Sequence, residues 1–317
     1  MRTYLDFEKT IAEIEDKIAE LRALAREGEE LSIEDDLKRL EAKAAESLKE
    51  LYRSLTPWQK TQVARHPERP HFSDYARVLF DEFTPLAGDR KFAEDHAIVG
   101  GPARFRGRAV MVIGHEKGSS TEARIKHNFG MARPEGYRKA ARLMETASRF
   151  GLPLISIVDT AGAYPGIGAE QRGQAEAIAR CTQACLNAEV PFVSVIIGEG
   201  GSGGAVAIAS ANNVLMLEHA IYAVASPEAS ASILWRDSAR AKDAADTMRI
   251  TAQDLLKFGV IDTIVAEPVG GAHREPVRAV VDTGNAIDAA LRSMDDSPGE
   301  ELVAARRGKF LEIGRHL

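Results

Sequence analysis

Apolar residues recur along this chain with two different periods. From the N-terminus to Leu55 they return every three or four positions, which is the spacing of one face of an α-helix. One stripe consists of Phe7, Ile11, Ile14, Ile18, Leu21 and Ala25, and a second of Ile33, Leu37, Leu40, Ala44, Leu48, Leu51 and Leu55. Gly28 is a typical helix stop, and Ser32 with Asp35 has the spacing of a capping box. The pattern predicts an antiparallel helical hairpin, which together with the proline-marked connection "RHPERPH" makes up residues 1–72.

Beyond about residue 97 the apolar residues form short continuous runs, which are typical of buried strands. The runs are "AIVGGPARF", "RAVMVIGHE", "LPLISIVD", "VPFVSVII", "NVLML" and "AIYAVAS". Helices are predicted at Ser73 to Phe83, in "PEGYRKAARLMETASRF" and at about residues 170–187. Alternating strands and helices indicate an α/β domain over 73–294, followed by a C-terminal tail over 295–317.

Two segments of this domain resemble each other at a constant offset along the chain. "LPLISIVDTAGAYPG" (152–166) superposes on "VPFVSVIIGEGGSGG" (190–204), with Pro153 on Pro191 and Ser156 on Ser194. Each segment reads as a buried strand that enters a glycine-rich turn and then a helix. Repeated units of this size favour a stacked, spiral arrangement over a single nucleotide-binding unit.

The composition is that of a globular protein, with 44% hydrophobic and 28% charged residues. No apolar run approaches the roughly 18–20 residues that span a bilayer, and the N-terminus lacks the features of a secretory signal. Cys181 and Cys185 are the only cysteines, too few for a disulfide framework or a zinc site. These features predict a cytoplasmic protein with reduced thiols, no bound metal and no membrane partner.

The net charge of −6 is unevenly distributed. Residues 1–50 hold 15 acidic and 9 basic side chains, which alone gives −6, whereas residues 104–149 hold 11 Lys or Arg and 4 Asp or Glu, which gives +7. The basic stretch is either a contact surface for phosphates or an acidic partner, or a solvated surface whose arginine stems cover apolar area.

The stretch "IIGEGGSGGAVAIA" (196–209) fits three functional templates. Gly198, Gly200 and Gly203 match the dinucleotide-binding fingerprint, whose helix would here be short and without a polar face. Ser202 matches the hydrolase elbow, with Asp262 and His273 following in the order such enzymes use. In the third template, backbone N–H groups at the start of a helix point at a developing negative charge and need no side chain.

The third interpretation explains most of these residues. Glycine lets the backbone approach a ligand closely, and a helix starting near Gly203 leaves unpaired N–H groups in its first turn. Two such turns, at 160–166 and 198–204, would supply two anion-binding pockets. Asp159 and Glu199 end their strands and are expected to brace these turns.

Several long motifs, in order, resemble the alpha subunit of bacterial acetyl-CoA carboxylase carboxyltransferase. They are "GHEKGSSTEARIKHNFGMARPEGYRKAARLM", "VDTAGAYPGIGAEQRGQAEAIAR", "IGEGGSGGAVAI", "SPEASASILW" and "EPVGGAHR", and the likeness runs from about Leu5 to Leu291. It implies a crotonase-type (ClpP/crotonase-like) fold, a spiral of ββα units with an N-terminal helical hairpin. It leaves out the tail after Ser293, and Ala161 stands where the family usually has proline.

The resemblance also implies a function. The chain would transfer the carboxyl group of carboxybiotin to acetyl-CoA, giving malonyl-CoA, in the committed step of fatty acid synthesis. The biotin would be attached to a separate biotin carboxyl carrier protein that is charged by a biotin carboxylase component. A beta subunit that carries the zinc would complete an α2β2 heterotetramer, and this chain would hold no cofactor of its own.

Carried onto this sequence, the resemblance assigns the oxyanion hole to the backbone amides of Gly203 and Gly204. Other residues of the two turns would line the biotin side of the pocket, namely Gly162, Ala163, Tyr164, Gly201 and Ser202. Contacts to CoA phosphates or to the carrier domain would come from Arg124, Lys126 and Arg133 in the basic stretch.

Other functions stay open at this level. One is a self-sufficient crotonase-like acyl-CoA hydratase or decarboxylase, which would need a carboxylate facing its substrate. A serine hydrolase using Ser202 is another, and a scaffold that binds partners through its acidic hairpin and basic stretch is a third.

Overall fold

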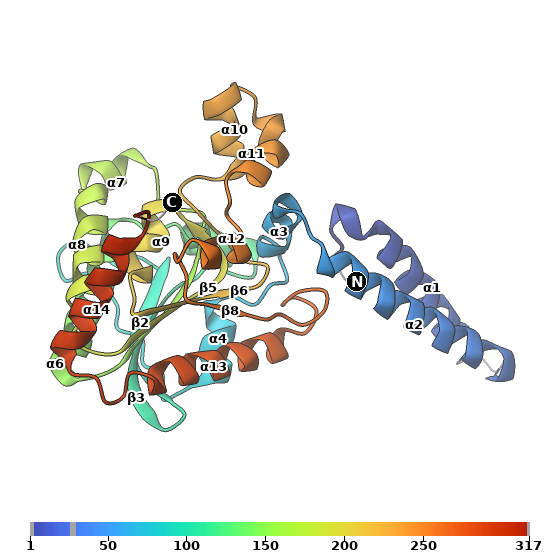
Figure 1. The fold of residues 1–317 in the computed structure, drawn as a ribbon, viewed down its shortest axis with the longest axis horizontal. Helices are drawn as coiled ribbons and strands as arrows, with labels where there is room; N and C mark the ends of the chain where they lie inside the picture. Colours follow the sequence, from blue (N-terminus) through green and yellow to red (C-terminus); the bar gives the residue numbers. More distant parts are fainter. Residues whose placement is uncertain (1–2, 26–29, 316–317) are drawn as a thin grey trace.

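The computed structural model describes residues 3–25 and 30–315, and its centre is one eight-stranded mixed sheet (Figure 1). The strand order is β1-β2-β3-β4-β5-β6-β8, and β7 pairs with the end of β5. Their bounds are β1 Phe80–Asp81, β2 Ile98–Phe105, β3 Arg108–His115, β4 Leu154–Thr160, β5 Phe192–Gly201, β6 Asn213–Leu217, β7 Ile221–Ala223 and β8 Thr263–Val265. β1 to β3 are antiparallel, whereas β3 to β6 and β8 are parallel.

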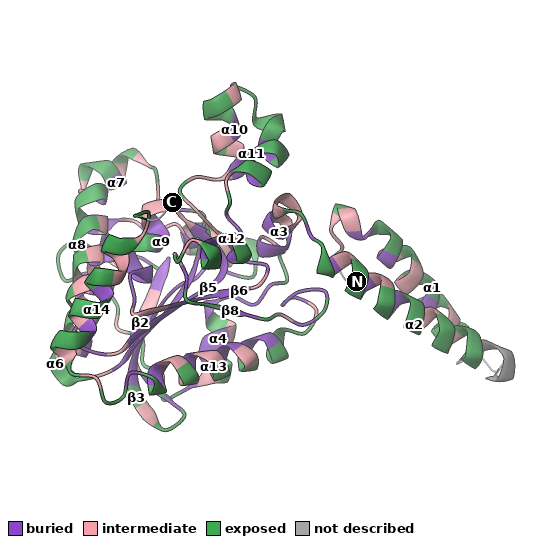
Figure 2. Ribbon diagram, in the orientation of Figure 1, coloured by how far each residue is buried: buried purple, intermediate pink, exposed green. Residues whose placement is uncertain are grey.

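Helices cover the sheet and carry its connections (Figure 1). The α-helices of the domain are α3 Pro57–Ala64, α4 Phe72–Leu79, α5 Thr121–Lys126, α6 Pro134–Phe150, α7 Ile167–Gln171, α8 Gln174–Asn187, α9 Ser202–Ala209, α10 Pro227–Trp235, α11 Ala241–Thr247, α12 Ala252–Lys257, α13 Pro276–Arg292 and α14 Gly299–Glu312. Short 3-10 turns lie at Asp6–Glu8, Asn128–Gly130 and Ser238–Arg240. Every residue of β4 and nearly every residue of β5 is buried, as their continuous apolar runs require (Figure 2).

The two repeated segments contain neighbouring strands, and their alignment in the sequence is the register in which these strands pair. β4 pairs with β5 in parallel, with Leu154 opposite Phe192 and Ser156 opposite Ser194, the same alignment that the two segments show in the sequence. The hydroxyl of Ser156 donates to the carbonyl of Ile208 at 2.6 Å, so the polar side chain inside this apolar strand has a partner. Because the two strands are in register, both glycine-rich turns lie at the same edge of the sheet.

The N-terminal hairpin consists of α1 Lys9–Ala25 and α2 Glu30–Arg53 and projects from the domain (Figure 1). Its base is fixed by a small apolar cluster that includes Ile11, Tyr52 and Val63. Glu8 is buried there and accepts hydrogen bonds from Tyr52 at 3.0 Å and Arg274 at 3.2 Å. The hairpin is therefore anchored at one end, and most of its length contacts only itself.

Several predicted helix boundaries were wrong. α2 begins at Glu30, so Ser32 lies inside the helix, and the predicted stop at Gly28 lies outside the described residues. The helix predicted to reach Phe83 ends at Leu79, because Phe80 enters the sheet opposite Phe105. The helix predicted at 170–187 is divided into α7 and α8 by Gly173, whose φ is +80°.

The C-terminal tail forms helix α14, which packs on α8 through a fully buried arginine. Arg306 donates to the carbonyls of Cys185 at 2.7 Å and Ala188 at 2.8 Å, and also to Val190 and Asn212. Two of these four residues, Ala188 and Val190, belong to the connection between α8 and β5, and Cys185 lies in the last turn of α8. The tail thus fixes the chain where it enters β5.

Candidate active site

The two glycine-rich turns follow β4 and β5 and meet backbone to backbone. β5 does not stop before the glycines, as the sequence suggested, but continues to Gly201, and α9 begins at the next residue. A Cβ on Gly201 would lie 2.2 Å from the carbonyl carbon of Ala161, and one on Gly204 would lie 2.7 Å from both the nitrogen of Ala163 and the carbonyl carbon of Gly162. Glycine is therefore required at positions 201 and 204 because a second stretch of backbone occupies the space of a side chain.

The start of α9 presents backbone donors without a capping side chain. Its N-cap is Gly201, and no described side chain caps its first turn. Gly203 and Gly204 are its second and third residues, whose N–H groups have no acceptor within the helix. A Cβ on Gly203 would meet only the side chain of Ile178, at 3.4 Å, so no second backbone packs against this residue.

A buried ionic cluster joins the C-terminal ends of the two strands beneath these turns. Lys117 lies 2.8 Å from a carboxylate oxygen of Asp159 and 2.8 Å from one of Glu199. The Glu199 N–H donates to Asp159 at 2.9 Å. Arg65 extends the cluster by donating to Glu199 at 2.6 Å and to Glu228 at 2.6 Å. The predicted bracing role of Asp159 and Glu199 thus has a geometric basis, with Lys117 as the bridge.

The charges of this cluster stabilise each other. Burial raises the pKa of Asp159, but the ammonium of Lys117, the His71 ring at 3.7 Å and the Glu199 N–H outweigh burial and hold that pKa well below the ordinary value. The pKa of Glu199 is also lowered, since Lys117 and Arg65 overcome the effect of burial. Burial lowers the pKa of Lys117, but its two carboxylate partners have the larger effect, so the net result is a pKa above the ordinary value. All three side chains are therefore charged at neutral pH.

Two buried residues at the turns were not found by sequence reasoning. The hydroxyl of Tyr137 lies 3.0 Å from the position of a Cβ on Gly204 and has no hydrogen-bond partner among the described residues. The fully buried His115 lies beside the backbone of Gly204, and burial lowers its pKa to about 4. Tyr137 sits on the apolar stripe of α6, where it is indistinguishable from a core residue in the sequence.

The structure brings most of the predicted pocket residues together. Gly162 and Ala163 pack against Gly204, and Tyr164 lies beside them with its ring 4.5 Å from the guanidinium of Arg133. The side chain of Arg124 donates to the carbonyl of Gly118 and lines a cavity of about 200 Å³ with Asp159, Ala161 and Glu199. Lys126 is exposed at the end of α5, and no described contact joins it to the turns.

The residues of a serine-hydrolase triad are not assembled. Asp262 accepts from the backbone of Val214 at 2.7 Å and pairs with Lys309. His273 stacks on His66 with ring centroids 3.8 Å apart, and burial together with the charge of neighbouring cations lowers its pKa to about 3. No described contact connects either residue to Ser202.

Within the described ranges, no group of three or more His, Cys, Asp or Glu side chains is placed to hold a metal ion. Cys181 and Cys185 are both buried and free. None of the described helices is long and apolar enough to cross a membrane.

Solved structures with the same fold include a transcarboxylase and a carboxylase subunit. The transcarboxylase 12S core with methylmalonyl-coenzyme A bound superposes with a TM-score of 0.57 at 21% identity, over 71% of this chain and 41% of that one. The beta subunit of P. aeruginosa geranyl-CoA carboxylase gives 0.56 at 17% identity, over 80% and 45%. This chain thus spans less than half the length of those two. The likeness confirms the predicted crotonase-type fold.

Relatives with high identity cover the whole chain. The acetyl-coenzyme A carboxylase carboxyl transferase subunit alpha of Xanthobacter autotrophicus is 67% identical over 317 residues, all of both chains. That of Rhizobium johnstonii is 63% identical over the same length. The family model described as acetyl co-enzyme A carboxylase carboxyltransferase-like matches residues 4–314, so the tail that the sequence comparison left out is also part of the likeness. This chain belongs to the acetyl-CoA carboxylase carboxyltransferase family.

Proposed function

We propose that this chain is the alpha subunit of an acetyl-CoA carboxylase carboxyltransferase, which moves the carboxyl group of carboxybiotin onto acetyl-CoA to give malonyl-CoA. The observation that carries the proposal is the uncapped start of α9, where Gly203 and Gly204 present N–H groups that have no acceptor within the helix. The full-length relatives named for this reaction support the assignment of that site to carboxyl transfer.

The reaction needs an oxyanion site of this kind. When the carboxyl group leaves the ureido nitrogen as CO2, negative charge gathers on the ureido oxygen. The N–H groups of Gly203 and Gly204 donate to that oxygen, and their fixed orientation makes them effective without reorganisation. The ureido nitrogen then takes a proton from the methyl group of acetyl-CoA, and the resulting enolate carbon forms its new bond to CO2.

The neighbouring turn forms the wall of the same site. In the proposed arrangement Gly162, Ala163 and Tyr164 bound the biotin side together with Gly201 and Ser202, while Arg133 holds the ring of Tyr164. We assign the contacts to CoA phosphates or the carrier domain to Arg124, Lys126 and Arg133. The zinc-bearing beta subunit, the α2β2 stoichiometry, the biotin carboxyl carrier protein and the biotin carboxylase component are parts of this proposal, as is a cytoplasmic location.

The reverse reaction tests the proposal directly. Malonyl-CoA and biocytin are mixed with this chain alone, and then with the beta subunit from the same cell, and acetyl-CoA release is followed. Activity is expected only in the mixture, and it should survive Ser202→Ala because no serine nucleophile takes part. Acetyl-CoA release by this chain alone would favour the self-sufficient hydratase or decarboxylase. No release in either mixture would contradict the assignment as a carboxyltransferase.

A further inference from the structure

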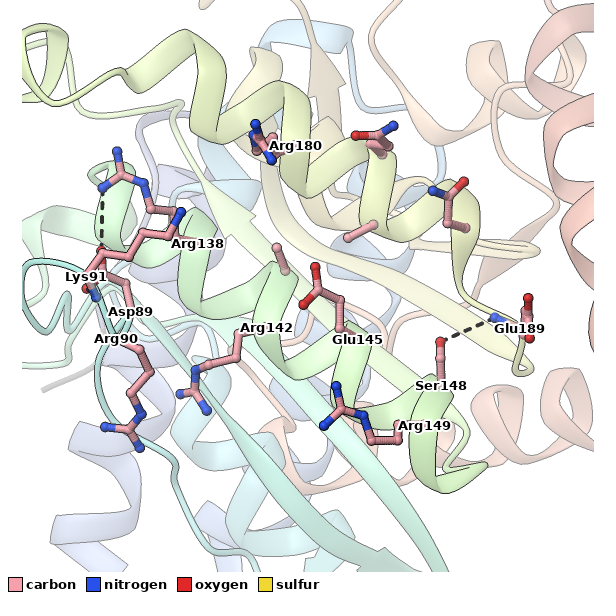
Figure 3. Close-up of a pocket in the computed structure, with 14 residues that line it drawn as sticks. Asp89, Arg90, Lys91, Arg138, Arg142, Glu145, Ser148, Arg149, Arg180 and Glu189 are labelled. Carbon is pink, nitrogen blue, oxygen red and sulfur yellow. Dashed lines mark hydrogen bonds and ion pairs between the residues drawn. The ribbon is translucent and has the colours of Figure 1, made fainter.

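A second concave site lies on the outer surface of α6 and α8, away from the glycine turns. It is a groove of about 640 Å³, within the size range of small-molecule sites, and the loop before β2 closes one end (Figure 3). Six cationic side chains and three acidic ones line it: Arg90, Lys91, Arg138, Arg142, Arg149 and Arg180, against Asp89, Glu145 and Glu189. The lining thus has a surplus of three positive charges.

Only some of these cations have a carboxylate partner. Arg138 pairs with Asp89 at 3.4 Å, and Arg180 pairs with Glu176 on its own helix. Within the part of the chain that the structure describes, no carboxylate lies within ion-pair distance of Arg90, Lys91 or Arg149. The surplus is therefore concentrated on side chains that are free to bind an external anion.

The loop that carries Arg90 is held rigidly. One carboxylate oxygen of the buried Asp89 accepts from the N–H groups of Lys91 at 2.9 Å, Phe92 at 2.7 Å and Ala93 at 3.1 Å. Within this turn Arg90 has a φ of +61°, an unfavourable conformation for a residue with a side chain. The loop therefore places Arg90 beside α6 at a conformational cost.

Arg90 and Arg142 face the same space (Figure 3). Arg142 donates to the carbonyls of Leu86 at 3.1 Å and Gly88 at 2.9 Å, which fix its position without cancelling its charge, and its Nε–H has no acceptor among the described residues. Burial and the charge of Arg90 together lower the pKa of Arg142. Two like charges held close together in this way are a site that an anion would stabilise.

We propose that this groove binds a phosphate-bearing anion of about nucleotide size. Arg90 and Arg142 hold one phosphate, and Arg149 holds a second anionic group about 10 Å further along α6, the rise of seven helical residues. Guanidinium groups suit phosphate because they donate two hydrogen bonds in a fixed geometry. The cations converge from a loop and two helices on a hollow, which favours a small ligand over an acidic protein surface.

The experiment is a calorimetric titration of the full-length chain with sodium tripolyphosphate at about 0.15 M salt, where exposed charges are screened beyond about 8 Å. We expect Arg90→Gln with Arg149→Gln to weaken binding at least about tenfold, since the loss of one charge-assisted hydrogen bond corresponds to that factor. The matched control is Arg39→Gln with Lys43→Gln, which removes two exposed charges from the hairpin. It should bind as the parent does.

The outcomes are distinct. No binding, equal binding by the groove variant, or an equal loss in the control would each overturn the proposal. Competition separates two sources of the same chemistry, because displacement by CoA would assign the groove to the phosphates of CoA and displacement by ATP alone to a free nucleotide. Loss of tripolyphosphate binding in the complex with the beta subunit would overturn the proposal in favour of a protein partner. Because binding is measured directly, the result does not depend on the proposed function.

Discussion

The two strand-and-turn units at the edge of the sheet begin alike and end differently. β4 and β5 pair in register, and each carries, close to its C-terminal end, an acidic residue that contacts Lys117. After β4 the turn satisfies itself, because the N–H of Gly162 donates to the hydroxyl of Thr160 at 3.1 Å. β5 itself runs through Gly201 and leads directly into α9, which has no capping side chain, so the first N–H groups of that helix are left to donate to a ligand. In the proposed site, the turn after β4 (160–166) is therefore the wall, and the start of α9 after β5 supplies the N–H donors.

The largest effect on activity should come from a side chain added where the start of α9 packs against the turn after β4. Gly204→Ala places a methyl group 2.7 Å from the backbone of Ala163, so the start of α9 must shift. We expect kcat of the reconstituted enzyme to fall by about 10²-fold or more, the loss typical of a displaced oxyanion donor. Gly203→Ala is the matched control, since its methyl group meets only Ile178 at 3.4 Å, and it should stay within about threefold. Equal kcat for the two variants would contradict the assignment of the donors.

Removing the bridge between the two units should cost stability. Lys117→Met leaves Asp159 and Glu199 as buried carboxylates without the cation they share. Loss of one partner from a buried ion pair costs about 3–5 kcal/mol, which chemical denaturation would measure. Lys126→Met, on an exposed lysine without a described partner, should change the free energy of unfolding by less than about 0.5 kcal/mol. A similar small change for Lys117→Met would mean that the turns hold together without the bridge.

The same variant should change the pH dependence of stability. In the parent the lowered pKa values of Asp159 and Glu199 stabilise the fold above about pH 4–4.5, and this contribution is lost as the pH falls further. In Lys117→Met burial would raise the pKa of Asp159, which has lost its ammonium partner, whereas Arg65 still pairs with Glu199 at 2.6 Å. At Asp159 the folded state would then bind a proton more tightly than the unfolded chain. The melting temperature of the variant is then expected to rise between about pH 7.5 and about pH 5, while that of the parent does not. Parallel pH profiles in calorimetry would refute this account.

The smallest effect is expected at the buried tyrosine beside Gly204. Tyr137→Phe removes a buried hydroxyl that has no described hydrogen-bond partner, so no hydrogen bond is lost. We expect the free energy of unfolding to stay the same or increase by up to about 1 kcal/mol. Activity should remain within about threefold of the parent. A large fall in kcat with unchanged stability would instead place this hydroxyl among the groups that act on the substrate.

Much of the architecture could be predicted because it depends on local patterns. The apolar runs of β2 to β6 gave their strands, the sequence from Pro134 to Gly151 gave α6 with its left-handed C-cap, and the internal repeat gave the register of β4 on β5. Phe80 was wrongly assigned to a helix, because it pairs with Phe105 in the sheet. Gly173 was also wrongly assigned to a helix, because its φ is left-handed.

The sequence by itself determined the glycine-rich turns, their order and the family to which the chain belongs, since these follow from residue types at fixed spacing. Only the tertiary structure decided which of these glycines pack directly against a second backbone, because that depends on how closely the two turns approach. It also decided that Lys117 joins Asp159 to Glu199, and that Arg90 faces Arg142 across a groove. These contacts join residues dozens of positions apart, so their geometry is set by the packing of the sheet and not by any local pattern.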